Sequence, residues 1–176
     1  MKHTLLILIA GLVALASGML VRNLNNISTE KVSVTADLFS TQLPDLQGTS
    51  HALSQWRGKI LVINFWATWC PPCLHEIPDF MVMQTDYAAK NVQFIGIALD
   101  EQQAVLDYTT KIGINYPILL GGNQGMGLAR QWGNLIESVP FTVVVNAQGT
   151  IVHRQLGEMS ASELQAILQP LLGKNI

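Results

Sequence analysis

Continuous apolar runs separated by mixed segments dominate the pattern of this chain. Residues 60–66 and 92–99 contain almost only apolar side chains, which is typical of strands covered on both faces of a parallel sheet. Residues 70–89 predict a helix, because Pro71 suits a first helical position. Residues 101–112 predict a second, amphipathic helix. Strands that alternate with helices in this way indicate an α/β fold.

Shorter elements complete the predicted domain. In chain order they are a hairpin with one helical turn at residues 39–56, a strand at 116–120, a helix at 125–132, and antiparallel strands at 141–146 and 150–155. Ser160 is a good N-cap with Glu163 at the capping-box position, which predicts a final helix that ends at Leu172. The expected architecture is a mixed β-sheet flanked by helices.

The N-terminal residues stand apart from this pattern. No charged residue occurs from Thr4 to Val21, and Lys2 precedes this run. A secretory signal cleaved after residues 14–16 and an uncleaved membrane anchor both fit. The run continues past that cleavage site to a total of about 18 uncharged residues, near the lower limit for spanning a bilayer, which favours the anchor. Lys2 predicts that the N-terminus stays cytoplasmic and that the domain is exported.

The rest of the chain predicts one domain. Residues 22–34 are polar and predict a tether after the signal-anchor of residues 1–21, and residues 35–176 predict the folded domain. The chain has 176 residues and a formal net charge of −2, with no basic cluster. A nucleic-acid partner is therefore not expected.

Cys70 and Cys73 are the only cysteines, and they stand at the start of a predicted helix directly after a predicted strand. Two thiols at this spacing close a small disulfide ring, so that one attacks a partner disulfide and the other completes the exchange. A purely structural disulfide is disfavoured, because so short a loop restricts the unfolded chain only slightly. A structural zinc site needs about four ligands, and the sequence offers no second such pair. Thiolates also select copper(I), so a copper or zinc carrier is the alternative function.

The position of each cysteine predicts its role. Cys70 lies at the helix N-terminus, where the helix dipole favours a thiolate, and is expected on the exposed side of the turn as the nucleophile. Cys73, one turn further in, is expected to be the buried resolving thiol. Pro71 and Pro72 have no N–H, so the Cys70 thiolate is supported mainly by the amide of Cys73 and the dipole. A moderately lowered pKa of Cys70, typical of a reductant rather than a strong oxidant, follows from this arrangement.

Glu76 is the candidate proton acceptor, because it lies three residues beyond Cys73 on roughly the same helix face. From spacing alone, an exposed first-turn glutamate that complements the helix dipole is the favoured interpretation. Likewise, Pro140 taken alone is an ordinary trans proline at the start of a strand.

Four motifs together resemble the thioredoxin superfamily, and within it the membrane-anchored TlpA/ResA-like thiol–disulfide oxidoreductases. In chain order they are Leu43-Pro44-Asp45-Leu46-x-Gly48, Leu53-Ser54-x-x-Arg57-Gly58-Lys59, Val62-x-Asn64-Phe65-Trp66-Ala67-Thr68-Trp69-Cys70-Pro71-Pro72-Cys73-x-x-Glu76-x-Pro78, and Val139-Pro140-x-Thr142. The resemblance implies a thioredoxin-like fold with an extra strand and helix inserted before the strand that follows Pro140.

The family resemblance also implies an activity and its partners. The expected reaction is the reduction of disulfides in exported proteins, such as apocytochrome c or a copper-site protein of a terminal oxidase, with no cofactor. Electrons are expected from a membrane protein that reduces the domain again. The implied location is the bacterial inner membrane, with the domain in the periplasm, or a soluble periplasmic form after signal cleavage.

At the site, the resemblance favours Glu76 as the proton acceptor and a cis Pro140 opposite the cysteines. The backbone of Val139 is then expected to pair with an extended substrate, and Trp69, Pro71 and Pro72 to contribute to substrate binding. Two departures from the family pattern stand out. Asn64 occupies the position of a buried Asp in soluble thioredoxins and cannot titrate, and the loop of residues 133–140 is about two residues longer than usual.

Overall fold

The computed structural model describes residues 38–173, and the predicted anchor and the whole predicted tether lie outside them. The elements are, in order, β1 (Gln42–Pro44), β2 (Ser50–Ala52), a 3-10 turn (Leu53–Trp56), β3 (Ile60–Trp66), α3 (Pro71–Tyr87), a 3-10 turn (Ala88–Lys90), β4 (Val92–Ala98), α4 (Gln102–Ile112), β5 (Ile118–Leu120), α5 (Gly122–Gln131), β6 (Phe141–Val145), β7 (Ile151–Leu156) and α6 (Ala161–Leu172). Within the described residues, no helix is long and apolar enough to cross a membrane.

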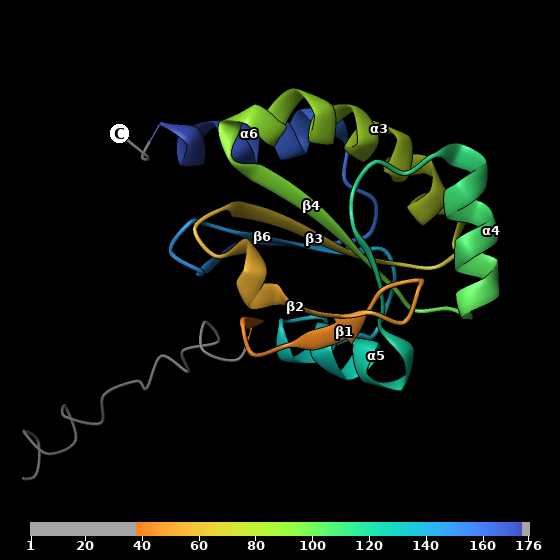
Figure 1. Ribbon diagram of the computed structural model, residues 1–176. Helices are drawn as coiled ribbons and strands as arrows, with labels where there is room; N and C mark the ends of the chain where they lie inside the picture. The colour runs from red at the N-terminus through yellow and green to blue at the C-terminus, as the bar shows by residue number, and fades with distance from the viewer. Residues whose placement is uncertain (1–37, 174–176) are drawn as a thin grey trace, which may run out of the picture. The chain divides into compact units, whose positions relative to one another are not determined.

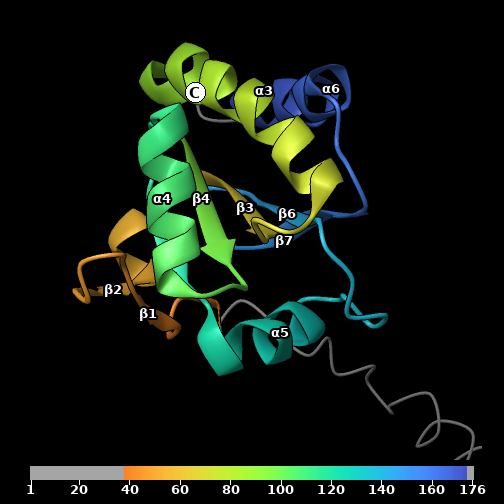
Figure 2. The same cartoon turned by 90° about the vertical axis from the view of Figure 1, so that its right-hand side faces the viewer.

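The main sheet has the strand order β5-β4-β3-β6-β7. β3 runs parallel to β4 and antiparallel to β6, so the sheet is mixed, as predicted. Helices α3 and α6 cover one face, and α5 with the β1–β2 hairpin covers the other (Figure 1). α4 lies beside β4 (Figure 2), and its buried Val105 belongs to the same core cluster as the inward side chains of α3.

The central strand β3 explains why its sequence is an unbroken apolar run. Successive side chains point to opposite faces of a sheet, and every residue of β3 is buried. Ile60, Val62 and Trp66 pack under α3 and α6 in one core cluster. Leu61, Ile63 and Phe65 pack on the opposite face in a second cluster. By the same alternation, Asn64 points to the face that α3 covers.

One predicted boundary is wrong for a physical reason. α5 begins at Gly122, three residues before the prediction, which took the glycines there as a break between elements. The structure instead uses them for close packing. A Cβ on Gly121, one of these glycines, would lie 2.8 Å from Cδ2 of Leu99, and one on Gly125 in the first turn would lie 2.3 Å from it, so the missing Cβ atoms leave room for the Leu99 side chain.

The C-terminal helix confirms its predicted cap. The Ser160 side chain accepts from the Glu163 amide, and the Glu163 side chain accepts from the Ser160 amide. This capping box fixes the start of α6 directly after Met159, a residue whose amide belongs to the site described next.

Candidate active site

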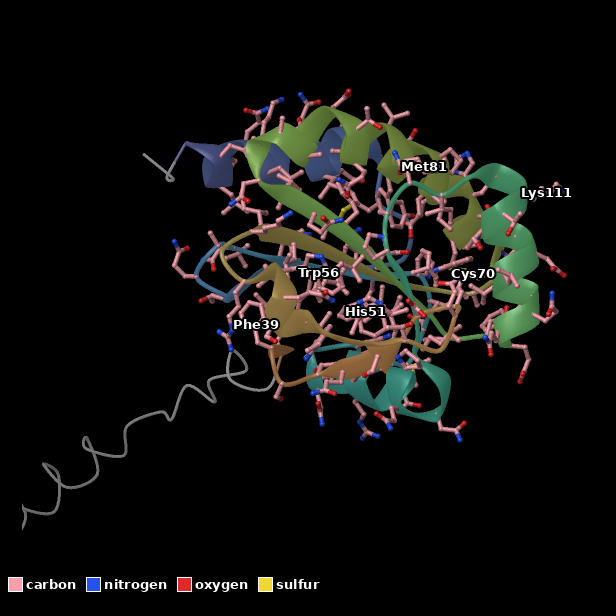
Figure 3. The ribbon with its side chains drawn as sticks, in the orientation of Figure 1. Phe39, His51, Trp56, Cys70, Met81 and Lys111 are labelled. Carbon is pink, nitrogen blue, oxygen red and sulfur yellow. A yellow bond between two sulfur atoms is a disulfide. The ribbon has the colours of Figure 1, made fainter. Side chains whose placement is uncertain are left out.

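Cys70 lies where β3 passes into α3 (Figure 3), and it forms a disulfide with Cys73. Cys70 is the N-cap of α3, and its sulfur accepts a hydrogen bond from the Cys73 amide at 3.3 Å. Pro71 and Pro72 occupy the first helical positions and donate nothing. The Cys70 sulfur therefore sits at the positive end of the helix with one amide donor from the first turn.

A second contact holds the turn before the cysteines against the neighbouring strand. The Thr68 amide donates to Oδ2 of Asp100 at 3.0 Å, and the Thr68 hydroxyl donates to the same oxygen. Asp100 lies two residues beyond the end of β4, and β4 is the parallel neighbour of β3. Asp100 was not predicted to contribute to the site, although a lone acid at the end of a buried strand was a usable signal.

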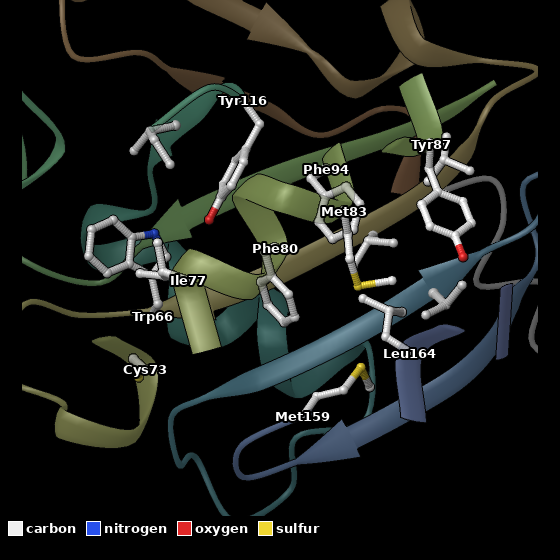
Figure 4. Close-up of a cluster of buried hydrophobic side chains, with 14 of the residues drawn as sticks. Trp66, Cys73, Ile77, Phe80, Met83, Tyr87, Phe94, Tyr116, Met159 and Leu164 are labelled. Atoms are coloured by element: carbon white, nitrogen blue, oxygen red, sulfur yellow. The ribbon is translucent and has the colours of Figure 1, made fainter. Parts of the chain in front are cut away.

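Accessibility differs from the prediction for Cys70. In the disulfide form its side chain is only 3% exposed, and Cys73 is fully buried, so the expected exposed sulfur is not found. The cause is local, because Cys70 packs in the same core cluster as Cys73. The exposed residues are the neighbours Trp69, Pro71 and Pro72. Cys73 lies beside Trp66 and Ile77 at the edge of that cluster (Figure 4).

Glu76 is 1% exposed, which overturns the interpretation of a solvated first-turn glutamate. Its Oε1 accepts from Nδ2 of Asn64 at 2.7 Å, and its Oε2 accepts from the Met159 amide at 2.9 Å. Burial raises the pKa of Glu76 from 4.5 to about 7, and these two donors limit the rise. A carboxyl with this pKa exchanges a proton readily at neutral pH.

Asn64 connects this carboxyl to the neighbouring strand. It pairs in register with Thr142 of β6, and its Nδ2 also donates to the Thr142 hydroxyl at 2.9 Å. Its Oδ1 is buried and has no hydrogen-bond partner among the described residues. Thr142 was not predicted to contribute, although a single polar residue within an apolar strand marks a position that needs a buried partner.

The peptide bond between Val139 and Pro140 is cis, as the resemblance implies. Val139 is half-buried and packs against the core cluster that contains both cysteines. The Pro140 carbonyl accepts a hydrogen bond from the Gly157 amide at 2.9 Å. Val139, the preceding residue, therefore lies just beyond the hydrogen bonds that join β6 to β7.

The described residues contain no group of three or more His, Cys, Asp or Glu side chains placed to hold a metal ion. His75 is exposed, and its Nδ1 contacts Oε1 of Glu158 rather than the cysteines. This hydrogen bond raises the pKa of His75 above its usual range.

Comparison with known proteins places this arrangement in a family. The Redoxin family model matches residues 29–168. The thiol-disulfide oxidoreductase ResA of Geobacillus kaustophilus is 28% identical over 149 residues, which cover 83% of each chain. ResA of Bacillus subtilis is 28% identical over 134 residues, 76% of this chain and 73% of that protein.

A solved structure agrees with these matches. A thiol:disulfide interchange protein of the thioredoxin family from Chlorobium tepidum superposes with a TM-score of 0.69 at 29% identity, and the match covers 76% of this chain and 94% of that one. The Cys70–Cys73 pair at the start of α3 supplies the two sulfurs for dithiol–disulfide exchange. The chain belongs to the Redoxin family and is a TlpA/ResA-like thiol–disulfide oxidoreductase of the thioredoxin superfamily.

Proposed function

We propose that this oxidoreductase works outside the cytoplasm as a reductant of protein disulfides. The observation that carries the direction of the reaction is the single first-turn amide donor to the Cys70 sulfur. Strong oxidants of this fold stabilise the thiolate of their reduced form. Here Pro71 and Pro72 replace two residues that could donate an N–H, so the Cys70 thiolate is stabilised less.

In the first step, the Cys70 thiolate attacks one sulfur of the substrate disulfide. A new S–S bond joins Cys70 to the substrate, and the other substrate sulfur leaves as a thiolate that takes a proton from solvent. In the second step, Cys73 gives up its proton and attacks the Cys70 sulfur. The Cys70–Cys73 disulfide forms, and the second substrate sulfur leaves as a thiolate. The substrate gains two electrons, and the enzyme dithiol is oxidised.

Glu76 is the proposed acceptor of the Cys73 proton. It lies one helical turn beyond Cys73 and is buried, so neither group exchanges protons freely with bulk water. A pKa of about 7 suits a base that accepts a proton at neutral pH and releases it afterwards. The Asn64 and Met159 donors hold the carboxylate in place.

Substrate and donor follow from the family resemblance and from the N-terminal sequence. The uncharged run behind Lys2 supports an anchored, exported domain. The proposed substrates are exported proteins with a disulfide, of the kind reduced during cytochrome c maturation or copper-oxidase assembly. The proposed electron donor is a membrane dithiol protein. The proposed partner of an extended substrate segment is the backbone of Val139, and the cis bond between Val139 and Pro140 supports this proposal.

The test is reduction of a protein disulfide such as that of insulin by the reduced full-length chain, in parallel with Cys70→Ser and Cys73→Ser variants. The unmodified chain releases two substrate thiols for each molecule oxidised. Cys73→Ser stops at a mixed disulfide visible on non-reducing gels, and Cys70→Ser does nothing. Stoichiometric, tight copper(I) or zinc binding without any disulfide reduction would instead support the metal-carrier function.

A further inference from the structure

A histidine and a carboxylate are paired at the surface, directly next in sequence to the buried contact of Glu76. His75 precedes Glu76 on α3, and its Nδ1 forms a hydrogen bond with Oε1 of Glu158. Glu158 precedes Met159, whose amide donates to Oε2 of Glu76 at 2.9 Å. The residues that precede the two partners of the buried contact are therefore joined to each other.

The His75–Glu158 pair is not what holds this segment of the chain in place. Met159 is 1% exposed and packs in the same core cluster as Cys73 (Figure 4). Ser160, the next residue, caps α6. The His75 side chain is 79% exposed and that of Glu158 is 41% exposed, and ion pairs with such exposure add little to stability. The pair therefore matters to Glu76 through its charges rather than as a clasp.

The two charges of the pair act on Glu76 in opposite directions. Burial is the main reason why the pKa of Glu76 is raised, and the negative charge of Glu158 adds to the rise. A protonated His75 offsets that negative charge, since it is hydrogen-bonded to the same carboxylate. The hydrogen bond with Glu158 raises the pKa of His75, and the charges of Glu158 and Asp79 add to this effect. His75 therefore stays cationic to a higher pH than a free histidine.

The other titratable groups around Glu76 bring no varying charge at neutral pH. Burial raises the pKa of Tyr116 and of Tyr108, so both phenols remain neutral. Glu163, in the first turn of α6, accepts hydrogen bonds from the Ser160 hydroxyl and amide, and these bonds lower the pKa of its carboxyl. The charge that changes beside Glu76 near pH 7 is therefore that of the His75–Glu158 pair.

We propose that His75 is a positioning residue of the exchange reaction: its cationic form offsets the charge of Glu158 beside Glu76 and thereby favours the ionised Glu76 that accepts the Cys73 proton. This inference rests on the proposed function, because only there does Glu76 take a proton from Cys73. His75 touches neither the substrate nor the reacting sulfurs, and it acts through Glu158.

The expected effect is small but has a definite sign. Because water screens an exposed pair of charges, we expect His75→Gln to raise the pKa of Glu76 by about half a unit. At pH 6, this rise lowers the ionised fraction of Glu76, and with it the rate of the second step, about threefold. At pH 9 Glu76 is ionised in both proteins, so the two rates are equal.

The experiment follows the side-chain carboxyl of Glu76 by ¹³C NMR during a pH titration of the oxidised full-length chain, and the signal is identified by its absence from Glu76→Gln. His75→Gln raises the pKa of Glu76, whereas His75→Lys keeps a cation beside Glu158 and keeps the original pKa. The double substitution His75→Gln/Glu158→Gln removes both charges and also returns the pKa to its original value. His51→Gln is the matched control, because His51 pairs with Asp45 on the β1–β2 hairpin and leaves Glu76 unaffected.

The double substitution separates charge from structure, because it lacks the bridge between α3 and the segment before α6 just as His75→Gln does. The inference is overturned if His75→Gln leaves the pKa of Glu76 unchanged. It is equally overturned if the double variant keeps the raised pKa, or if His75→Lys fails to restore it. Stopped-flow measurement of the second step at pH 6 and pH 9 provides the kinetic test. An unmodified chain that reduces no disulfide removes the proposed function, whereas an active chain whose Glu76 does not respond to His75 removes this inference alone.

Discussion

Replacement of Glu76 by Gln tests the reasoning about the buried carboxyl through protein stability. In the unfolded chain this group has its ordinary pKa of 4.5, and in the folded oxidised protein burial raises the pKa to about 7. Below pH 4.5 both states hold the proton, so the group costs nothing. Between pH 4.5 and 7 only the folded state keeps its proton, and the free energy of unfolding falls as pH rises. At about 1.4 kcal/mol per pH unit, the loss reaches about 3 kcal/mol above pH 7.

The Gln side chain removes this loss, since it carries no charge at any pH. Both groups that face position 76, Asn64 Nδ2 and the Met159 amide, are donors, so the Gln NH2 finds a partner when the Asn64 side-chain amide rotates by 180° and presents its unpaired Oδ1. We therefore expect Glu76→Gln to be more stable than the unmodified protein at pH 8, by up to about 3 kcal/mol, and to lose this advantage near pH 4.5.

The assay is denaturant unfolding of the oxidised protein at a series of pH values from 4 to 9. Glu101→Gln, at an exposed residue before α4, is the matched control. Carboxyls common to all variants cancel in the difference between curves, so the difference isolates Glu76. Parallel stability curves for Glu76→Gln and the unmodified protein would refute the buried, protonated carboxyl.

Two further predictions concern the exchange reaction. Glu76→Gln is expected to slow the second step, the attack by Cys73, by about 100-fold or more, while the attack by Cys70 keeps its rate. Stopped-flow kinetics measure both steps, and an equal effect on the two would contradict this role of Glu76. Titration of the reduced protein by thiolate absorbance is expected to give Cys70 a pKa below the ordinary thiol value of about 8.5 but well above the value of about 3.5 found in strongly oxidising proteins of this fold. A pKa near 4 would refute the argument from the missing N–H donors.

The fold was predictable because its main signals are local. β3 coincides with its predicted run, since a strand buried on both faces must be apolar throughout. The cap of α6 was equally readable, because a capping box lies within four residues of sequence. The start of α5 could not be predicted in this way. Glycines have a low helix propensity, but here they also permit close packing on Leu99. Which of these effects dominates depends on a contact between residues distant in sequence.

The candidate site was also predictable where its signals are local, and not where they depend on contacts between distant residues. The cysteine pair and the prolines between them are a local pattern, and the structure keeps them together at the start of α3. The burial of Glu76 was not predictable from spacing, because its second donor is the amide of Met159, 83 residues away. The low exposure of Cys70 was missed because packing around the disulfide, rather than position on the helix, determines it.

Asn64 and Glu76 are best understood as one unit. Two donors, from Asn64 and Met159, favour the carboxylate form of Glu76, whereas burial favours the acid form. Burial is the larger effect, so the pKa settles at about 7, and the two donors keep it from rising further. An Asp at position 64 would put a second carboxyl within hydrogen-bond distance of the first and would remove a donor, so that one of the two acids would hold its proton well above neutral pH. An uncharged amide on β3 therefore allows the single buried acid of this site to reside on α3, one turn from Cys73.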